Sequence, residues 1–301
     1  MLLTHKADRK GKLLSFLRRE LKLSSGLIGH LKYENCFFVD GKPAYTDLPV
    51  LPGQTITVKI EESRPAEFTP EYTEISIVYE DEYLLAVDKP AGVIVHPTFY
   101  RTSGTLLTQV LGYYEKTGQD CGIHFVNRLD RDTCGVVLLA KNAYIHALLY
   151  DAQLAGDFDK TYHAVCVGVP EKAEGEIDLP IGRVDGGSLL RKIDEQGQSA
   201  LTRYRLLESR DGLSLMELMP VTGRTHQLRL HCLSLGIPIL GDPQYNTEQS
   251  KALSARYGLT VQQLCAEKLC LHHPLSGELL TLKAKHTIFL PERLQSAQND
   301  V

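Results

Sequence analysis

The sequence predicts an α+β protein in which a small amino-terminal domain precedes a larger one. Leucines that recur every three or four residues near the amino terminus predict helices, and short apolar segments divided by polar turns predict strands further along. At 301 residues the chain is long enough for both domains. The polar, proline-bearing stretch 63–72 has no periodicity, so we interpret it as a linker between domains over residues 1–62 and 73–295.

Composition limits the class of protein. Hydrophobic residues make up 43% of the chain and charged residues 23%, as in an ordinary soluble globular protein. No segment has the length of a membrane span, and the first residues lack the apolar run of a signal peptide. The seven cysteines lie in apolar stretches without Cys-x-x-Cys spacing. They predict reduced thiols, and hence a cytoplasmic protein without a metal site.

Charge is distributed unevenly along the chain. Residues 1–35 hold eight Lys and Arg against three Asp and Glu, a balance of +5. Because the whole chain carries −4, the remainder carries −9. A basic module on an acidic body favours a nucleic-acid partner. The alternative, that these cations only keep a helix soluble, stays open.

The small domain is predicted to contain two helices and a hairpin. Residues 11–21 place leucines on one face of a helix, and Ser24 is suited to cap a second one. Strands are expected over 36–39 and 55–60, with an Asp-Gly turn after the first. This order resembles the αL RNA-binding domain of small-subunit ribosomal protein four. The resemblance implies that Arg18 and Arg19, on the first helix, meet RNA phosphates.

The large domain is predicted to alternate strands with a few helices. Strands are expected over residues 75–79, 83–87, 93–97, 160–168 and 213–221. Helices are expected to follow three capping residues, Ser103, Asn142 and Thr225. The glycine-rich stretch 171–203 predicts a hairpin around Arg191 and Lys192, which are candidates for RNA contact with ordinary exposed charge as the alternative.

A cluster of charged residues interrupts the apolar stretch 124–141. Arg128, Asp130, Arg131 and Asp132 fall between two predicted strands. Buried carboxylates are costly unless they are paired, so such a turn between core strands needs a reason. A turn with solvated charges is the ordinary reason. The other is an active-site carboxylate that a rigid sheet presents on a loop.

Several motifs in combination resemble those of pseudouridine synthases of the RluA group, over most of residues 75–290. The matching segments are 89–92 with 96–97, the catalytic motif 128–135 (Arg-Leu-Asp-x-x-Thr-x-Gly), 160–162, 223–231, 236–245 and 271–274. The resemblance implies a mixed, largely antiparallel sheet with flanking helices, crossed by a cleft with Asp130 at its floor. This chain departs from the family at Asn127, where His is usual, and at Cys134, where Ser or Thr is usual. We interpret both departures as packing changes.

The resemblance also implies roles for single residues. Asp130 would be the catalytic aspartate and Arg229 its counter-charge, while Tyr162 would stack on the target base. Arg128 would fill the space that the extruded nucleotide leaves, and Leu271 is assigned to substrate binding. His226 and His231 lie off a common helical face, so we interpret them as structural, as we do the adjacent pair 272–273.

The implied reaction isomerises uridine in RNA to pseudouridine. It involves no redox step, so no cofactor is expected, and we expect a monomer with an RNA partner. Ribosomal RNA is favoured by the small domain, with transfer RNA as the alternative. Two other classes compete: a catalytically silent RNA-binding or ribosome-assembly factor, and a carboxylate-dependent hydrolase. The sequence offers the latter no second carboxylate with an obvious general-acid role.

Overall fold

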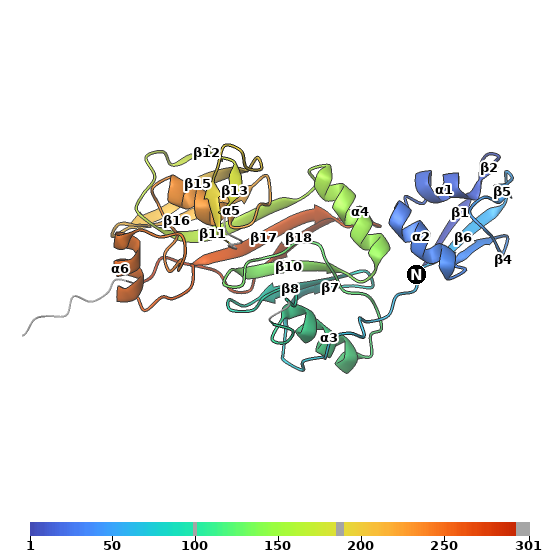
Figure 1. Cartoon of the computed structure of the whole chain (residues 1–301), viewed down its shortest axis with the longest axis horizontal. Helices are drawn as coiled ribbons and strands as arrows, with labels where there is room; N and C mark the ends of the chain where they lie inside the picture. The colour runs from blue at the N-terminus through green and yellow to red at the C-terminus, as the bar shows by residue number, and fades with distance from the viewer. Residues whose placement is uncertain (99–100, 185–189, 293–301) are drawn as a thin grey trace, which may run out of the picture.

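The computed structural model describes residues 1–98, 101–184 and 190–292. It places the amino-terminal elements at one end of an elongated molecule, beside a large sheet with helices on its faces (Figure 1). None of the helices in these ranges is both long and apolar enough to cross a membrane.

The amino-terminal elements form a four-stranded sheet packed against two helices. The sheet order is β1-β6-β3-β4, and the separate pair β2–β5 lies beside it. The elements are β1 (Leu2–Lys6), β2 (Gly11–Lys12), α1 (Leu13–Arg19), α2 (Ser25–Tyr33), β3 (Phe37–Val39), β4 (Lys42–Pro43), β5 (Pro49–Val50) and β6 (Thr55–Lys59). Ser24 caps α2 as predicted, since its hydroxyl accepts from the Leu27 amide at 3.2 Å. Strand β1, which pairs antiparallel with β6, was not predicted.

The second sheet has ten strands in the order β12-β15-β16-β11-β17-β10-β8-β7, with β18 beside β17 and β9 beside β10. The strands are β7 (Ser76–Glu80), β8 (Leu84–Lys89), β9 (His124–Phe125), β10 (Cys134–Ala140), β11 (Asp159–Val167), β12 (Glu174–Asp178), β15 (Leu201–Arg210), β16 (Leu213–Pro220), β17 (Leu264–His272) and β18 (Leu279–Lys283). Strands β10 and β17 run parallel, and the other recorded pairs of this sheet are antiparallel. The predicted mixed, largely antiparallel sheet is therefore confirmed.

Helices cover both faces of the central strands. The helices of this part are α3 (Leu106–Thr117), α4 (Ala143–Leu154), α5 (Gln227–Ser234) and α6 (Glu248–Arg256). Alternate residues of β8 and β10 enter two different clusters, one under α4 and one under α3. Figure 1 shows these two helices on opposite sides of the strands. Both faces of β8 and β10 are thus buried, which explains their continuous apolar sequence.

Three local predictions need correction. Residues 93–97 form no strand, because Ile94 makes only an isolated bridge to Thr105. Thr105, not Ser103, caps α3, since it forms a reciprocal capping box with Thr108. The residue before α5 is His226 in a left-handed conformation, so Thr225 is not its cap. The predicted hairpin does form, from β13 (Ile181–Arg183) and β14 (Arg191–Ile193), and Asn142 caps α4 as predicted.

The chain between β6 and β7 has neither helix nor strand, and it packs along α3. The Glu71 amide donates to the Thr108 carbonyl at 2.8 Å. At Gly112 of α3 a Cβ would lie 2.1 Å from the Glu71 carbonyl oxygen, so glycine permits this close approach. The segment interpreted as a linker is therefore fixed against the large sheet's own helix.

Candidate active site

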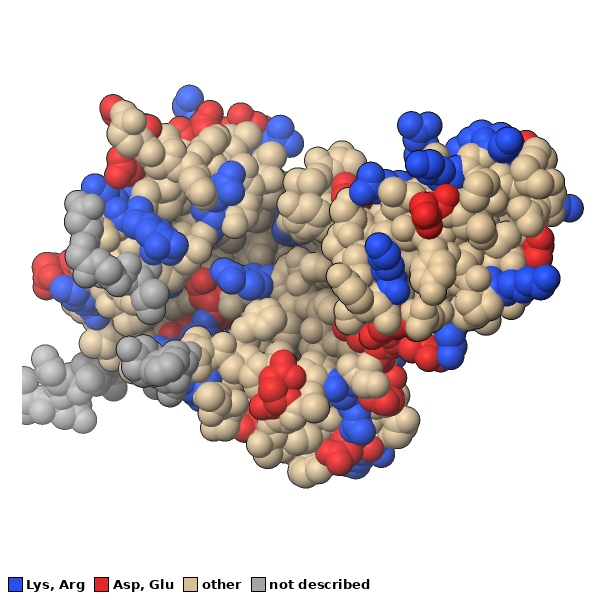
Figure 2. All heavy atoms as spheres, turned by 45° about the vertical axis from the view of Figure 1, so that its right-hand side comes forward, with Lys and Arg blue, Asp and Glu red and all other residues tan. Residues whose placement is uncertain are grey.

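A cleft of about 650 Å³ crosses the large sheet. Its walls come from the loop between β9 and β10, from strand β11, and from the segment that leads into α5. The face drawn in Figure 2 is hollowed between the upper and lower parts of the large domain, and acidic and basic side chains meet there. The residues predicted to carry the chemistry, Arg128, Asp130, Tyr162 and Arg229, all line this cleft.

Asp130 lies on the loop that joins β9 to β10, with 28% of its side chain exposed. Arg229 Nη1 donates to Asp130 Oδ2 at 3.2 Å, the contact expected from the sequence. His226 Nε2 lies 3.9 Å from the same oxygen. Within the described part of the chain, no side chain or amide donates to Asp130 Oδ1. One carboxylate oxygen is thus held by the protein while the other is available to a substrate.

Arg229 is held in place by a second carboxylate that the sequence did not single out. Its Nε and Nη2 donate to the two oxygens of Asp242 at 2.7 and 2.8 Å, and Nη2 also donates to Gln244 Oε1. Although burial opposes the charge, Asp242 and Asp130 raise the pKa of Arg229 above its ordinary value. The guanidinium therefore stays cationic and points at Asp130 in a fixed orientation.

Lys89, in the first motif, clamps the loop that carries Asp130. It is fully buried, and its Nζ donates to the carbonyls of Pro90, Val93 and Arg131 at 2.9, 2.8 and 2.9 Å. Burial lowers the pKa of Lys89 to about 8, so the ammonium still carries three protons for these three carbonyls at neutral pH. The sequence predicted only a turn here, because a buried lysine is rare and residue type alone does not reveal it.

Gly135 fixes where the loop rejoins the sheet. Its φ is +111°, and a Cβ there would lie 2.3 Å from the Ala266 carbonyl oxygen of β17. A side chain is excluded both by conformation and by the neighbouring strand. The loop carrying Asp130 therefore meets β17 at a fixed position.

Tyr162 enters the cleft at an irregularity in the sheet. The register between β11 and β17 shifts between Thr161 and His163, which leaves Tyr162 paired with β16 alone. Such bulges re-aim a side chain next to active sites. Burial raises the pKa of the Tyr162 phenol well above its ordinary value, so the ring stays neutral. An uncharged aromatic in the cleft is suited to stacking on a base.

The two departures from the family pattern have structural explanations. Asn127 Nδ2 donates to the Val136 carbonyl at 3.0 Å, and its Oδ1 accepts from the Leu138 amide at 2.8 Å. The side chain thus bridges the backbone of β10. Cys134 Sγ lies 3.6 Å from the Leu264 carbonyl and is half-buried against β17. Both contacts are internal, as the interpretation of packing changes requires.

Of the remaining predicted residues, Arg128 alone lines the cleft. Arg128 is exposed where it lines the cleft. Leu271, which was assigned to substrate binding, does not line the cleft: it is 1% exposed in the cluster beneath α4, and Leu264 of the same strand lines the cleft instead. Lys192 of the hairpin pairs with Asp194 at 3.2 Å. The Arg191 amide donates to the Tyr245 hydroxyl at 2.8 Å.

The histidines interpreted as structural are hydrogen-bonded in separate networks. His226 Nδ1 lies 2.7 Å from the Tyr245 hydroxyl. His231 is buried between Thr202 and the Leu179 carbonyl. In residues 1–98, 101–184 and 190–292, no group of three His, Cys, Asp or Glu side chains is arranged to hold a metal ion.

Comparisons with known proteins agree on one family. The family model of RNA pseudouridylate synthase matches residues 83–234. YhcT of Bacillus subtilis, described as an uncharacterized RNA pseudouridine synthase, is 33% identical over 94% of this chain and 92% of its own. Ribosomal large subunit pseudouridine synthase D of Nitrosomonas europaea is 33% identical over 88% of this chain and 78% of its own.

A solved structure supports the same conclusion. Human RNA pseudouridylate synthase domain containing 1 superposes with a TM-score of 0.58 at 26% identity, covering 74% of this chain and 93% of that one. The relatives extend over nearly the whole chain, and the family model covers the loop of Asp130 and the helix of Arg229. The chain therefore belongs to the RNA pseudouridine synthase family and is an isomerase of uridine in RNA.

Proposed function

We propose that the enzyme isomerises uridines of large-subunit ribosomal RNA, with Asp130 as the catalytic carboxylate. The observation that carries the proposal is the arrangement at Asp130: Oδ2 is bound by Arg229 at 3.2 Å, while Oδ1 is left to the cleft that Tyr162 also lines. A guanidinium beside the carboxylate favours its ionised form. An ionised carboxylate is what either attack on the ribose or removal of its proton requires.

The reaction needs little beyond this arrangement. The bond from ribose C1′ to uracil N1 breaks, the base rotates, and C1′ bonds to C5. The proton on C5 is released and N1 gains one, so atoms and charge balance without a cofactor. Tyr162 stacks on the base and restrains it during rotation. The target atom is inaccessible within a stacked helix, so the nucleotide is extruded and exposed Arg128 enters the vacated space.

The amino-terminal domain, residues 1–62, is proposed to bind RNA as an αL domain, ahead of a catalytic domain over residues 73–295. Arg18 and Arg19 are exposed at the end of α1, which supports this role. Figure 2 draws Lys and Arg side chains gathered along the upper surface of this domain. The names of relatives such as ribosomal large subunit pseudouridine synthase D favour ribosomal over transfer RNA. We place the enzyme in the cytoplasm, as a monomer.

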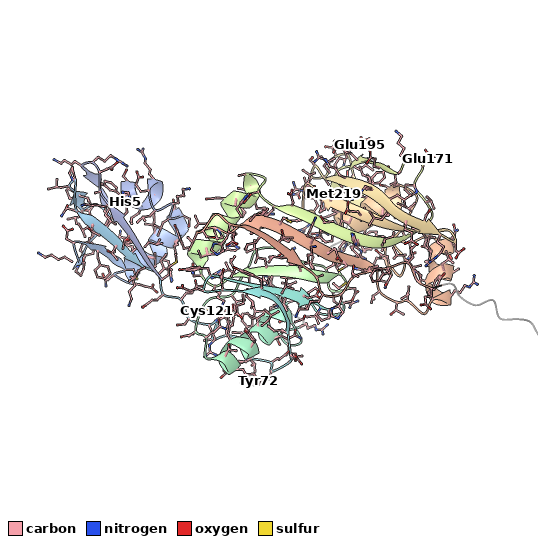
Figure 3. The ribbon with its side chains drawn as sticks, turned by 180° about the vertical axis from the view of Figure 1, so that it is seen from behind. His5, Tyr72, Cys121, Glu171, Glu195 and Met219 are labelled. Atoms are coloured by element: carbon pink, nitrogen blue, oxygen red, sulfur yellow. The ribbon has the colours of Figure 1, made fainter. Side chains whose placement is uncertain are left out.

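Tritium release tests the catalytic assignment. RNA carrying tritium at uracil C5 should lose it on incubation with the wild-type protein and keep it with Asp130→Asn. Glu195→Gln is the matched control, because Glu195 is an exposed carboxylate on the outer surface of the same domain (Figure 3). Release by Asp130→Asn at the wild-type rate would overturn the proposal. Mapping pseudouridine in RNA from cells that lack the protein distinguishes ribosomal from transfer RNA.

A further inference from the structure

His226 adopts a backbone conformation that L-residues rarely accept. Its φ is +60° and ψ is +17°, immediately before α5. A non-glycine residue in this left-handed region costs free energy, and such residues concentrate at functional sites. The side chain is 13% exposed and lines the cleft. The conformation directs one ring nitrogen at Tyr245 and the other at Asp130, 2.7 Å and 3.9 Å away respectively.

The contacts of Tyr245 favour one tautomer of this ring. The Tyr245 hydroxyl accepts from the Arg191 backbone amide at 2.8 Å, and an amide N–H can only donate. The single proton of the hydroxyl is therefore free to be donated to His226 Nδ1 at 2.7 Å. A neutral imidazole that accepts at Nδ1 carries its proton on Nε2. That Nε2–H faces Asp130 Oδ2.

We propose that His226 is a positioning residue whose Nε2–H, set by Tyr245, holds Asp130 Oδ2 together with Arg229. The inference rests on the proposed role of Asp130. Arg229 and His226 converge on the same oxygen, from 3.2 Å and 3.9 Å, so that Oδ1 alone faces the substrate. At 3.9 Å His226 Nε2 is not within hydrogen-bond distance of Asp130 Oδ2, and we expect the distance to shorten when RNA fills the cleft, as catalytic hydrogen bonds commonly tighten in the substrate complex.

An uncharged hydrogen-bond donor is suited to the position beside Asp130, because Arg229 already supplies the positive charge there. The charged groups facing the ring are Asp130 on its loop, Arg229 on α5, Arg191 on β14 and Asp242 after α5. Burial, with the two arginines acting in the same direction, lowers the pKa of His226 below its ordinary value. Near pH 7 the ring is thus uncharged and orients the carboxylate without adding a second adjacent cation, which would weaken its basicity.

The tautomer can be measured without any activity. Nitrogen-15 spectra of histidine-labelled protein should show His226 protonated at Nε2 and unprotonated at Nδ1, with the signals assigned from their loss in His226→Asn. Tyr245→Phe removes the hydroxyl but keeps the ring that stacks 4.8 Å from the Arg229 guanidinium. In that variant Nδ1 should lose its hydrogen bond and the Nδ1–H tautomer should become populated. A wild-type ring protonated at Nδ1 overturns the proposal.

Two substitutions of His226 test the contributions of its two ring nitrogens separately. Asparagine tolerates the left-handed conformation and reaches Tyr245, but has no group at the Nε2 position. Glutamine places an uncharged N–H there. His226→Asn should lower the single-turnover rate by about 10- to 100-fold with little change in KM for RNA, and His226→Gln should recover most of it. In the wild-type protein the single-turnover rate should fall at acid pH as His226 gains a proton. His226→Gln should lack this fall, because glutamine does not titrate.

The outcomes are distinct from those that test the reaction itself. Equal rates for wild type and His226→Asn overturn the role of His226, as do equally slow rates for folded Asn and Gln variants. Thermal unfolding of each variant establishes that it folds. Where His226→Asn does not fold, the His226 signals are assigned in the wild-type protein by through-bond correlation, and its tautomer decides the matter. Absence of pseudouridine formation by the wild-type protein would instead overturn the proposed function, while the tautomer measurement still stands.

Discussion

Arg229 Nη1 donates to Asp130 Oδ2 at 3.2 Å although the two residues are 99 positions apart in the chain. The same guanidinium binds both oxygens of Asp242, whose side chain is fully buried. Arg229 therefore keeps its orientation when RNA binds. Asp242 holds the edge formed by Nε and Nη2, and Nη1 faces the cleft. A donor that is oriented before the reaction needs no reorganisation during it.

Removing Asp242 should damage both stability and activity. Asp242→Ala leaves the buried Arg229 without its bidentate partner, and breaking such a pair costs about 3–5 kcal/mol of unfolding free energy. Asp242→Asn keeps the shape and should lie between this variant and wild type. Urea denaturation and tritium release measure the two effects. Asp47→Asn, at an exposed carboxylate of the small domain, is the control and should match wild type in both. Full activity in Asp242→Asn would show that Arg229 needs no such anchor.

Gly135→Ala should displace the loop that carries Asp130. The new Cβ would lie 2.3 Å from the Ala266 carbonyl oxygen, and alanine is strained at a φ of +111°. We expect a loss of about 1–3 kcal/mol in unfolding free energy and a lower single-turnover rate. Gly29→Ala is the matched control, because nothing lies within 4 Å of its Cβ position inside helix α2. It should stabilise by roughly 0.5–1 kcal/mol. A Gly135→Ala protein as stable as wild type would contradict the close packing of β10 on β17.

The residues that motifs identify lie where the sequence places them, because each motif is a short local pattern. Asp130, Tyr162 and Arg229 were expected at one cleft, and they line it. Asp242 and Lys89 were given no role, since an aspartate in a Gly-Asp-Pro turn and a lysine before a proline both have ordinary explanations. Only the three-dimensional structure shows their roles. Asp242 is the buried partner of Arg229, and Lys89 donates to three backbone carbonyls.

Strand prediction failed where pairing rather than residue type decides. Residues 93–97 are rich in β-branched side chains, yet no neighbouring strand pairs with them beyond one bridge. β1 was overlooked because its five residues, Leu-Leu-Thr-His-Lys, show no clear alternation. It is a strand because β6 offers it a partner of matching length. Leu271 lies away from the cleft for a related reason: a matching segment does not tell which face of a strand a side chain occupies.

Glu62, which follows β6, should make the packing of this segment against β9 and α4 sensitive to acid. It accepts from His124 Nε2 at 2.6 Å and from the first amide of α4, Ala143, at 2.9 Å. Although burial opposes ionisation, the hydrogen bond and charge of His124 lower the pKa of Glu62 below its ordinary value. Its stabilisation is therefore complete above the ordinary glutamate pKa and is lost as pH falls through the lowered one.

Unfolding of Glu62→Gln across pH checks this direction. At neutral pH the variant should be less stable than wild type by about 1 kcal/mol, a value reduced for partial exposure. The two curves should converge in acid, where wild-type Glu62 is itself protonated. Glu61→Gln, at the exposed neighbour that pairs with Lys59, should track wild type throughout. A difference that persists unchanged into acid would mean that the charge of Glu62 is not its source.

Neutralising the end of α1 should weaken RNA binding without affecting the reaction centre. In Arg18→Gln/Arg19→Gln, two exposed cations are lost from the amino-terminal domain, which lies at the opposite end of the molecule from α6 (Figure 1). Each phosphate contact removed should reduce the slope of log affinity against log salt by about 1.

Lys251→Gln/Arg256→Gln removes the same charge from exposed positions of α6 and is the matched control. Because counterion release depends on contacts with RNA and not on net charge alone, the first variant should lose affinity at low salt and the second should not. Equal loss in both variants would assign the effect to overall charge, and no loss in either would remove α1 from the RNA-binding surface.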